Sequence, residues 1–346
     1  MRIWVASLLA IGILETASAQ TPAPVRRPLV DFPTDNRSLL EGRLADFFMY
    51  VNRDFGGVRT KPWEGGQYGF VRGPQQTPAG VVYRQMHEGI DIKPVERDAA
   101  GVPLDVVQAA ADGVVAYVSD DPRASNYGRY LVVQHNISGS PYFTLYAHLA
   151  SVAVGVGQSV SQGSTLGILG YTGAGIDRER AHVHFEFNMM LTRNFAGYAS
   201  IADPRDPNRH GNFNGRNLVG VDAAKLLVAV RRDPSFNLAQ WIASDQPAFR
   251  VRIKNSPNLD LLRMYPWLAG AAAGSNPPAW TITFSQYGVP LRAEPFAIPV
   301  TEPVLAWVVP AESYTRATRG MVTGSPGSPR LSDSGMRMAK LLTYPD

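Results

Sequence analysis

Between residues 81 and 188 the chain is a succession of short runs of β-branched and aromatic residues, each bounded by turn-forming residues. Runs of this length and composition predict strands rather than helices. Five glycines punctuate residues 155–170, which indicates tight hairpins. We therefore expect a mostly β protein built on a compact antiparallel β core with an open groove and flanking helices. The clearest strand-like runs are GVVAYV (113–118), RYLVVQH (129–135), YFTLYAHL (142–149) and HVHFEF (182–187).

The flanking sequence predicts helices on both sides of this core. Apolar spacing within residues 36–54 predicts a helix, and Ser38 with Glu41 matches a capping box. Asp222 and Ser235 can each cap a helix that follows them. Residues 193–217 are polar and typical of a loop.

The last third of the chain has a different texture, with strand-like runs separated by Pro-rich connections and a helical pattern, SGMRMAKLL, near its end. These runs are FRVRIK (249–254), AWTITF (279–284) and PVLAWVV (303–309). A length of 346 residues fits two domains, or one large domain with appendages. We expect an N-terminal linker and helix over 20–61, a β-rich domain with insertions over 62–230, and a mixed α/β accessory region over 231–346.

The N-terminus has the three parts of a signal peptide, which we place at residues 1–19. Arg2 supplies a positive charge, residues 3–14 form an apolar stretch of twelve, and Ala17-Ser18-Ala19 is a small-residue cleavage site. Twelve apolar residues are too few to span a hydrocarbon core of roughly 30 Å. We expect export to the periplasm or the outside, with no stable membrane anchor after cleavage.

The chain contains no cysteine. This excludes disulfides, thiolate metal sites, cysteine nucleophiles and a lipoprotein anchor, so that any metal site must use His, Asp or Glu. The net charge of +4 is small, and no run of Lys and Arg exceeds two residues. We therefore expect no nucleic-acid partner.

Two separate motifs place histidines beside strand-like residues. In MHEGID, an extended backbone aims His87 and Asp91 to the same side, and Gly89 argues against a helix. In HVHFEF, His182 and His184 share one face of a strand while the intervening residues belong in the core. Each motif alone is weak, since two histidines satisfied within a core would give H-x-H, and many solvated turns would match H-x-x-x-D.

Together the motifs offer the donors of an open zinc site. Two imidazole nitrogens and one carboxylate leave a fourth position for water, an arrangement typical of catalytic zinc. A remaining imidazole can accept and return protons near neutral pH. The strand pattern alone does not distinguish His182 from His184 as the ligand.

The set H-x-x-x-D, Y-A-H-L and H-x-H followed by F-E resembles the lysostaphin/LytM-type zinc endopeptidases, which cut peptide cross-links in bacterial cell walls and have a duplicated-hybrid-motif fold. The resemblance covers roughly residues 62–195 and includes the Gly-rich segment before H-x-H. It implies that His87, Asp91 and His184 bind one Zn²⁺. It also implies that His148 and His182 flank the reacting water, and that the substrate is a peptidoglycan peptide.

The first hypothesis is thus an exported zinc metalloendopeptidase that hydrolyses peptide bonds in peptidoglycan stems or bridges. His148 would stabilise the oxyanion and His182 would assist proton transfer, with the reverse assignment open. The alternative is a non-catalytic activator that binds peptidoglycan and stimulates a separate cell-wall amidase; its expected signature is a missing ligand. A lipoyl-like carrier is disfavoured because no lysine lies between Lys93 and Lys225.

Five further residues require an interpretation of their own. Glu186 is either a hydrogen-bond acceptor for His184 or a surface carboxylate. Tyr146 is more typical of a packed strand than of an oxyanion donor. Asn126 suits a turn but could shape the cleft, His135 is expected to be structural, and His210 is expected to be solvated.

Overall fold

The computed structural model describes residues 27–346 apart from residues 203 and 206, and the expected signal peptide at 1–19 lies outside this range. In this part of the chain every strand pairing is antiparallel. Strands predominate, which confirms the mostly β fold expected from the sequence. The elements, in chain order, are η1 (Ser38–Glu41), α1 (Leu44–Phe47), β1 (Arg53–Phe55), β2 (Val58–Thr60), η2 (Trp63–Gly66), β3 (Gly69–Thr77), β4 (Gly80–His87), β5 (Ile90–Ile92), β6 (Val106–Gln108), β7 (Gly113–Ser119), β8 (Arg129–Ile137), β9 (Ser140–Leu149), β10 (Ser151–Val152), β11 (Ser159–Val160), β12 (Thr165–Ile168), β13 (Val183–Met190), α2 (Phe195–Ala202), β14 (Leu218–Val221), α3 (Ala223–Arg232), α4 (Leu238–Ala243), β15 (Pro247–Lys254), α5 (Asp260–Met264), η3 (Pro266–Leu268), η4 (Gly270–Ala272), β16 (Ala279–Ser285), β17 (Pro290–Phe296), β18 (Val304–Val308), α6 (Tyr314–Ala317), β19 (Val322–Ser325), β20 (Ser328–Leu331) and α7 (Asp333–Leu341).

The largest sheet has seven strands, in the order β11-β7-β8-β9-β13-β14, with β5 also paired to β13. Strand β13 is its centre: β9 lies along one edge, while β5 and β14 share the other edge. Val183, Phe185 and Phe187 are fully buried on its core face, as the alternation in HVHFEF predicts. The strand runs expected at 113–118, 129–135 and 142–149 are confirmed as β7, β8 and β9.

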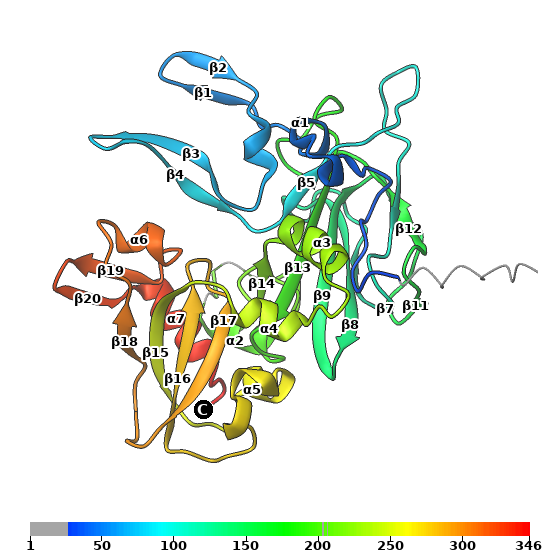
Figure 1. The fold of residues 1–346 in the computed structure, drawn as a ribbon. Coiled ribbons are helices and arrows are strands. Elements are labelled where there is room, and N and C mark those ends of the chain that lie inside the picture. The colour runs from blue at the N-terminus through cyan, green and yellow to red at the C-terminus, as the bar shows by residue number, and fades with distance from the viewer. Residues whose placement is uncertain (1–26, 203, 206) are drawn as a thin grey trace, which may run out of the picture.

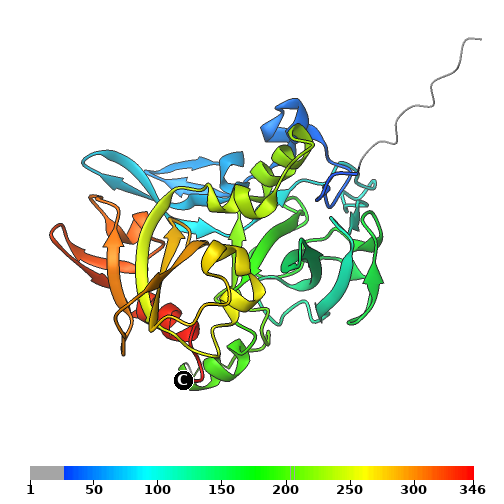
Figure 2. The ribbon, with the colours of Figure 1, turned by 60° about the horizontal axis from the view of Figure 1, so that its bottom comes forward.

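A second sheet, β17-β16-β15-β18, is the main sheet of the last hundred residues. Figures 1 and 2 show it in yellow and orange beside the green strands β13 and β14. Buried residues of this C-terminal region and of the large sheet belong to one continuous hydrophobic cluster. The junction is also polar, because the backbone N–H of Met190 donates a 2.9 Å hydrogen bond to Oη of Tyr265. The buried carboxylate of Asp260 accepts from the backbone of Arg193 at 2.7 Å.

The helix expected over residues 36–54 is wrong. The segment contains only the short η1 and α1, and the Ser38 side chain caps neither. Gly42 has φ 73°, a left-handed backbone that ends the first turn. The chain then enters β1, so the apolar spacing reflects packing of a bent segment onto the core.

The other helix predictions are mixed. Asp222 caps α3 by accepting from the backbone N–H of Lys225, as expected. Asn237 rather than Ser235 caps α4. Helix α2 lies in the segment expected to be a loop, with Phe195 and Ala199 buried.

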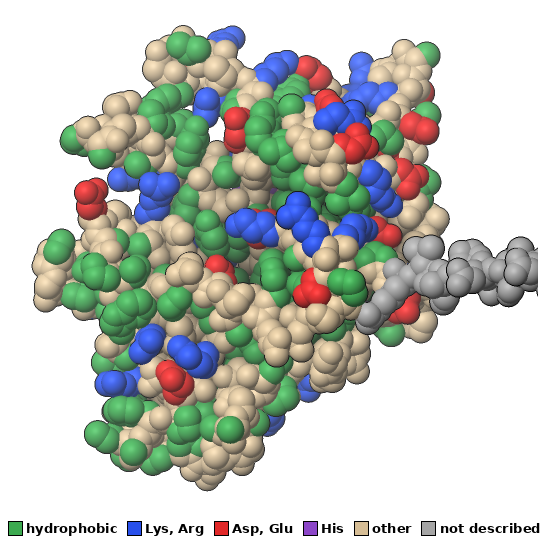
Figure 3. Space-filling model, viewed as in Figure 1, with side chains coloured by type: hydrophobic (Ala, Val, Ile, Leu, Met, Phe, Trp, Pro, Cys, Tyr) green, Lys and Arg blue, Asp and Glu red, His purple; other side chains and the backbone are tan. Residues whose placement is uncertain are grey.

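Two hairpins and a mixed distribution of charge characterise the surface of the molecule. The hairpins β1–β2 and β3–β4 project from the same side of the molecule in Figure 1. On the face that Figure 3 draws, positive and negative side chains are interspersed among hydrophobic ones. Across residues 27–346, apart from 203 and 206, no helix combines the length and the hydropathy of a membrane span.

Candidate metal centre

Strand register brings the widely separated donors together. In the β13–β5 pairing His184 lies directly opposite Asp91, so that both side chains project to the same face of the sheet. His87 ends β4, and His182 immediately precedes β13, where it pairs with Gly170. All four residues are buried, with exposed fractions of 5% or less.

Three donor atoms form a nearly equilateral triangle. Nε2 of His87 lies 3.0 Å from Nδ1 of His184 and 3.1 Å from Oδ1 of Asp91. The third edge, from Nδ1 of His184 to Oδ1 of Asp91, is 3.0 Å. Bonds of 2.0–2.1 Å to a tetrahedral zinc ion place ligand atoms about 3.3 Å apart. The triangle therefore has about the size that one divalent ion would require, and all three residues line the cleft described below.

Backbone carbonyl groups fix the orientation of two imidazoles, those of His87 and His182. Nδ1 of His87 donates to the carbonyl of Gln67 at 2.8 Å, and Nδ1 of His182 donates to the carbonyl of Arg180 at 2.6 Å. Because a carbonyl oxygen can only accept, each neutral ring carries its lone pair on Nε2. This nitrogen of His87 thus points its lone pair at Asp91 and is suited to bind a cation.

His184 is oriented the other way, by Glu186. Nε2 of His184 donates to Oε1 of Glu186 at 2.8 Å, which leaves Nδ1 for the donor triangle. Glu186 is 1% exposed and also accepts from Oη of Tyr127 at 2.8 Å and Nδ2 of Asn188 at 2.9 Å. Of its two interpretations, the acceptor for His184 is what the structure shows, and Tyr127 is a partner that sequence reasoning missed.

The centre attracts positive charge. Burial disfavours the charged form of Asp91, yet His87 and His182 hold the pKa of this carboxyl well below its usual range. Nη2 of Arg72, on β3, is 2.5 Å from the other oxygen of the same carboxylate. Burial also disfavours charged His184, but its hydrogen bonds to Asp91 and Glu186 raise the pKa of His184 to about 9. In the absence of a metal the triangle thus holds a proton, which a bound cation must displace.

His148 reaches the centre through an unusual backbone conformation. By strand alternation it would share the core face with Tyr146, but its φ of 65° turns the side chain into the cleft. Its Nδ1 donates to the carbonyl of Thr172 at 2.9 Å, and its ring lies 4.8 Å from that of His182. Burial and the neighbouring His182 hold the pKa of His148 well below 6.5, so it is neutral at pH 7.

These groups line a cleft of about 760 Å³. Four arginines also line it, from segments far apart in the sequence, and Glu88 and Asp91 are the carboxylates in its wall. Arg319 comes from the last thirty residues of the chain and lies 2.5 Å from Glu88. The four arginines are Arg72, Arg180, Arg216 and Arg319.

The remaining candidates divide between cleft and core. Asn126 lines the cleft, and so does His210, whose Nδ1 is 2.7 Å from Oη of Tyr130. The expectation that His210 is merely solvated is therefore wrong. His135 is 1% exposed and hydrogen-bonded on both nitrogens, as expected of a structural residue. Tyr146 is fully buried and accepts from the backbone of Ala110 at 2.9 Å, which confirms its packing interpretation.

Comparison with known proteins identifies the segment that carries this centre. Residues 85–194 match the family model described as Peptidase family M23. This range contains His87, Asp91, His148, His182 and His184. Three of the cleft arginines lie outside it, namely Arg72, Arg216 and Arg319.

Curated relatives match over the same part of the chain. Peptidoglycan DD-endopeptidase ShyA of Vibrio cholerae is 39% identical over 80 residues, which are 23% of this chain and 16% of that protein. Cell division protein DipM of Caulobacter vibrioides is 32% identical over 120 residues, 35% of this chain and 17% of that protein. The chain thus spans less than a fifth of the length of these relatives. The solved catalytic domain of lysostaphin from Staphylococcus simulans is 26% identical, with 35% of this chain and 75% of that one covered and a TM-score of 0.25.

Proposed function

We propose that the protein is an exported zinc metalloendopeptidase that hydrolyses peptide bonds in peptidoglycan, because residues 85–194 match the model of Peptidase family M23. The observation that carries the proposal is the triangle of His87 Nε2, Asp91 Oδ1 and His184 Nδ1, with edges of 3.0–3.1 Å. Export rests on the signal-peptide pattern of residues 1–19, and the substrate class on the name of the Vibrio relative.

His87, Asp91 and His184 are the residues that would hold the ion. Two neutral imidazoles and a carboxylate suit Zn²⁺, and the chain offers no thiolate alternative because it lacks cysteine. When zinc is bound, its chemistry is that of a Lewis acid, which acidifies water and polarises a carbonyl group. Arg72 donates to the second oxygen of Asp91, which would leave one carboxylate oxygen for the ion.

His148 and His182 form the proton-handling pair. Each donates Nδ1–H to a backbone carbonyl and so presents the lone pair of Nε2. With ring centroids 4.8 Å apart, a proton on one ring disfavours a second proton on the other. We propose that one ring accepts the proton of the attacking water and the pair returns it to the leaving amine.

The alternative of a non-catalytic activator is not favoured, because such a protein is expected to lack a ligand and here the ligand set is complete. We place the catalytic domain at residues 62–230 and the accessory region at residues 231–346.

The test separates metal binding from proton transfer. His184→Ala is expected to lose bound zinc and hydrolysis together, because it removes one corner of the triangle. His148→Ala is expected to keep zinc and lose at least ~100-fold in rate, the usual contribution of a general acid or base. Zinc is measured by mass spectrometry of the purified protein, and hydrolysis by the new peptide termini released from peptidoglycan sacculi.

His135→Gln is the control, since it changes a buried histidine that does not line the cleft. It is expected to retain both zinc and hydrolysis. Full hydrolysis by either alanine variant would refute the proposal.

A further inference from the structure

The C-terminal region reaches the cleft through one side chain, Arg319. Its guanidinium lies 2.5 Å from the carboxylate of Glu88, the residue that follows the ligand His87. Nη1 of the same group donates to the carbonyl of Tyr287 at 3.4 Å. Two of its five N–H donors are thereby used among the described residues, so donors remain for another acceptor.

The backbone at Arg319 is held in an uncommon conformation. Its φ is 51°, and the turn is fixed by buried Thr318, whose hydroxyl donates to the carbonyl of Tyr314 at 2.7 Å and accepts from Val322 at 3.0 Å. Three non-glycine residues have positive φ in the described chain, and two of them, His148 and Arg319, line this cleft. Left-handed backbone at a non-glycine residue persists only where the surroundings impose it, and such residues gather at functional sites.

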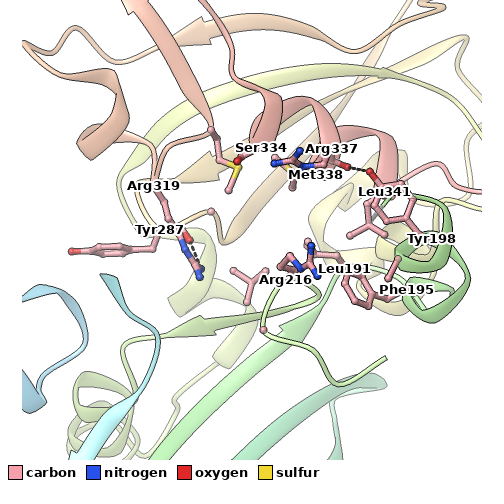
Figure 4. Close-up of a pocket in the computed structure, with 16 residues that line it drawn as sticks. Leu191, Phe195, Tyr198, Arg216, Tyr287, Arg319, Ser334, Arg337, Met338 and Leu341 are labelled. Atoms are coloured by element: carbon pink, nitrogen blue, oxygen red, sulfur yellow. Dashed lines mark hydrogen bonds between the residues drawn. The ribbon is translucent and has the colours of Figure 1, made fainter. Parts of the chain in front are cut away.

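Arg319 also lies where the cleft adjoins a second cavity. A cavity of about 200 Å³ lies between α2 and α7, and Gly215, Arg216 and Arg319 line both the cavity and the cleft. Figure 4 shows the side chains of Arg216 and Arg319 at this cavity, with Arg337 and Met338 of α7 on its other side. The cavity is mostly apolar, lined among others by Leu191, Phe195, Val219, Met321 and Leu341. A charged group would therefore stay at the junction, beside the guanidinium groups, rather than enter the cavity.

The charge of the cleft favours an anionic ligand there. Four arginines and two carboxylates line it, and one of the carboxylates, Asp91, is already paired with Arg72. The Arg319–Glu88 pair is accessible, with side chains 19% and 33% exposed. Exchange of Glu88 for another carboxylate therefore buries no new charge.

We propose that Arg319, with Arg216 beside it, forms a subsite for a carboxylate of the peptide substrate, at which the substrate displaces Glu88. Both arginines lie outside the segment of the family match, and Arg319 belongs to the C-terminal region, which thereby contributes to the choice of peptides that are cut. This inference rests on the proposed function, because it names a feature of the same substrate.

Binding to peptidoglycan sacculi tests the subsite without hydrolysis, in the His182→Ala protein. Two probes are used: native sacculi, and sacculi whose carboxyl groups are amidated with carbodiimide and ammonium chloride. Arg319→Gln is expected to weaken co-sedimentation with native sacculi about tenfold, the value of one charge-assisted hydrogen bond. With amidated sacculi it is expected to change nothing.

Two further variants separate recognition from structure and from general charge. Glu88→Gln breaks the same ion pair from its other side, and is expected to bind native sacculi as well as or better than its parent. Arg292→Gln removes an exposed arginine of β17, more than half exposed, and is expected to have no effect on either probe.

Equal losses with native and amidated sacculi, equal losses in Arg319→Gln and Arg292→Gln, or a loss in Glu88→Gln that matches Arg319→Gln would each overturn the subsite. Failure of the protein with His182 intact to hydrolyse sacculi would instead contradict the proposed function, and it leaves the ratio between the two probes measurable.

Discussion

At the scale of single residues, the centre depends on side chains outside the triangle of donor atoms. Glu186 is buried and accepts three hydrogen bonds, one of which sets the orientation of His184. Ligands whose other ring nitrogen loses its acceptor bind metal less tightly. Glu186 could be named from HVHFEF, but Tyr127 could not, because 59 residues separate it from its partner.

Glu186→Ala is expected to weaken zinc binding ~10–100-fold, because His184 is then free to turn and the buried donors to Glu186 lose their acceptor. Competition with a chromogenic chelator measures the affinity. Tyr127→Phe removes only one of the three donors and is expected to have a smaller effect. Unchanged affinity in Glu186→Ala would show that backbone register alone orients His184.

The pH dependence of stability is argued from His135, which does not line the cleft of the candidate metal centre. Burial lowers the pKa of His135 below 6.5 in the folded protein. As the pH falls below 6.5, His135 binds a proton in the unfolded chain but remains neutral in the folded protein until a lower pH is reached. The contribution of His135 is therefore complete above pH 6.5 and is lost as the pH falls through its lower folded value.

His135→Gln is thus expected to lose less stability than the parent protein between pH 7 and pH 5. Urea unfolding at the two pH values measures this, and titration of the metal centre is common to both proteins. An identical or steeper loss in the variant would contradict the assignment.

At the scale of elements, two loops position His148. The backbone N–H of His148 donates to the carbonyl of Tyr127, and its Nδ1 donates to the carbonyl of Thr172, both at 2.9 Å. The loops that carry these carbonyls touch at Gly173, where an added Cβ would lie 2.2 Å from the carbonyl oxygen of Asn126. This contact explains why a glycine-rich turn precedes H-x-H.

Gly173→Ala is expected to keep zinc and to reduce hydrolysis about 100-fold, since a displacement of about 1 Å in a catalytic group has an effect of that size. Gly175→Ala is the matched control. Gly175 lies in the same loop and also has positive φ, but an added Cβ meets nothing within 4 Å. Equal effects in the two variants would mean that backbone strain, not the contact with Asn126, is responsible.

Local pattern was a good guide to strands and a poor one to backbone exceptions. The alternation in HVHFEF predicts both faces of β13, because a strand buried on one side repeats every two residues. The same rule fails at His148, whose left-handed backbone reverses its face. The helix expected over 36–54 failed because Gly42 ends the first turn, and tertiary packing then bends the segment.

At the scale of the whole molecule, the C-terminal region is part of the same core as the large sheet. Arg319 and His210 enter the cleft from outside the family segment, and no sequence spacing relates them to His184. Long-range packing decides such positions, so sequence analysis identified the five central groups and missed the arginines around them.

Tyr265→Phe tests the packing of the C-terminal region against the large sheet. It removes the acceptor of a buried backbone N–H at Met190 and is expected to reduce the free energy of unfolding by ~1–3 kcal/mol. Tyr198→Phe is the control, because its hydroxyl donates to Arg337 at an exposed position and is expected to matter by less than ~0.5 kcal/mol. Equal stabilities in urea unfolding would mean that the two regions pack independently.

The central claim is that one divalent ion is held by three side chains brought together by strand register. Anomalous diffraction at the zinc absorption edge, from crystals grown with zinc, tests it most directly. The account predicts one strong peak in the cleft, ~2.0–2.2 Å from His87 Nε2, Asp91 Oδ1 and His184 Nδ1. A peak bound by other residues, or no peak within reach of Asp91, would contradict it.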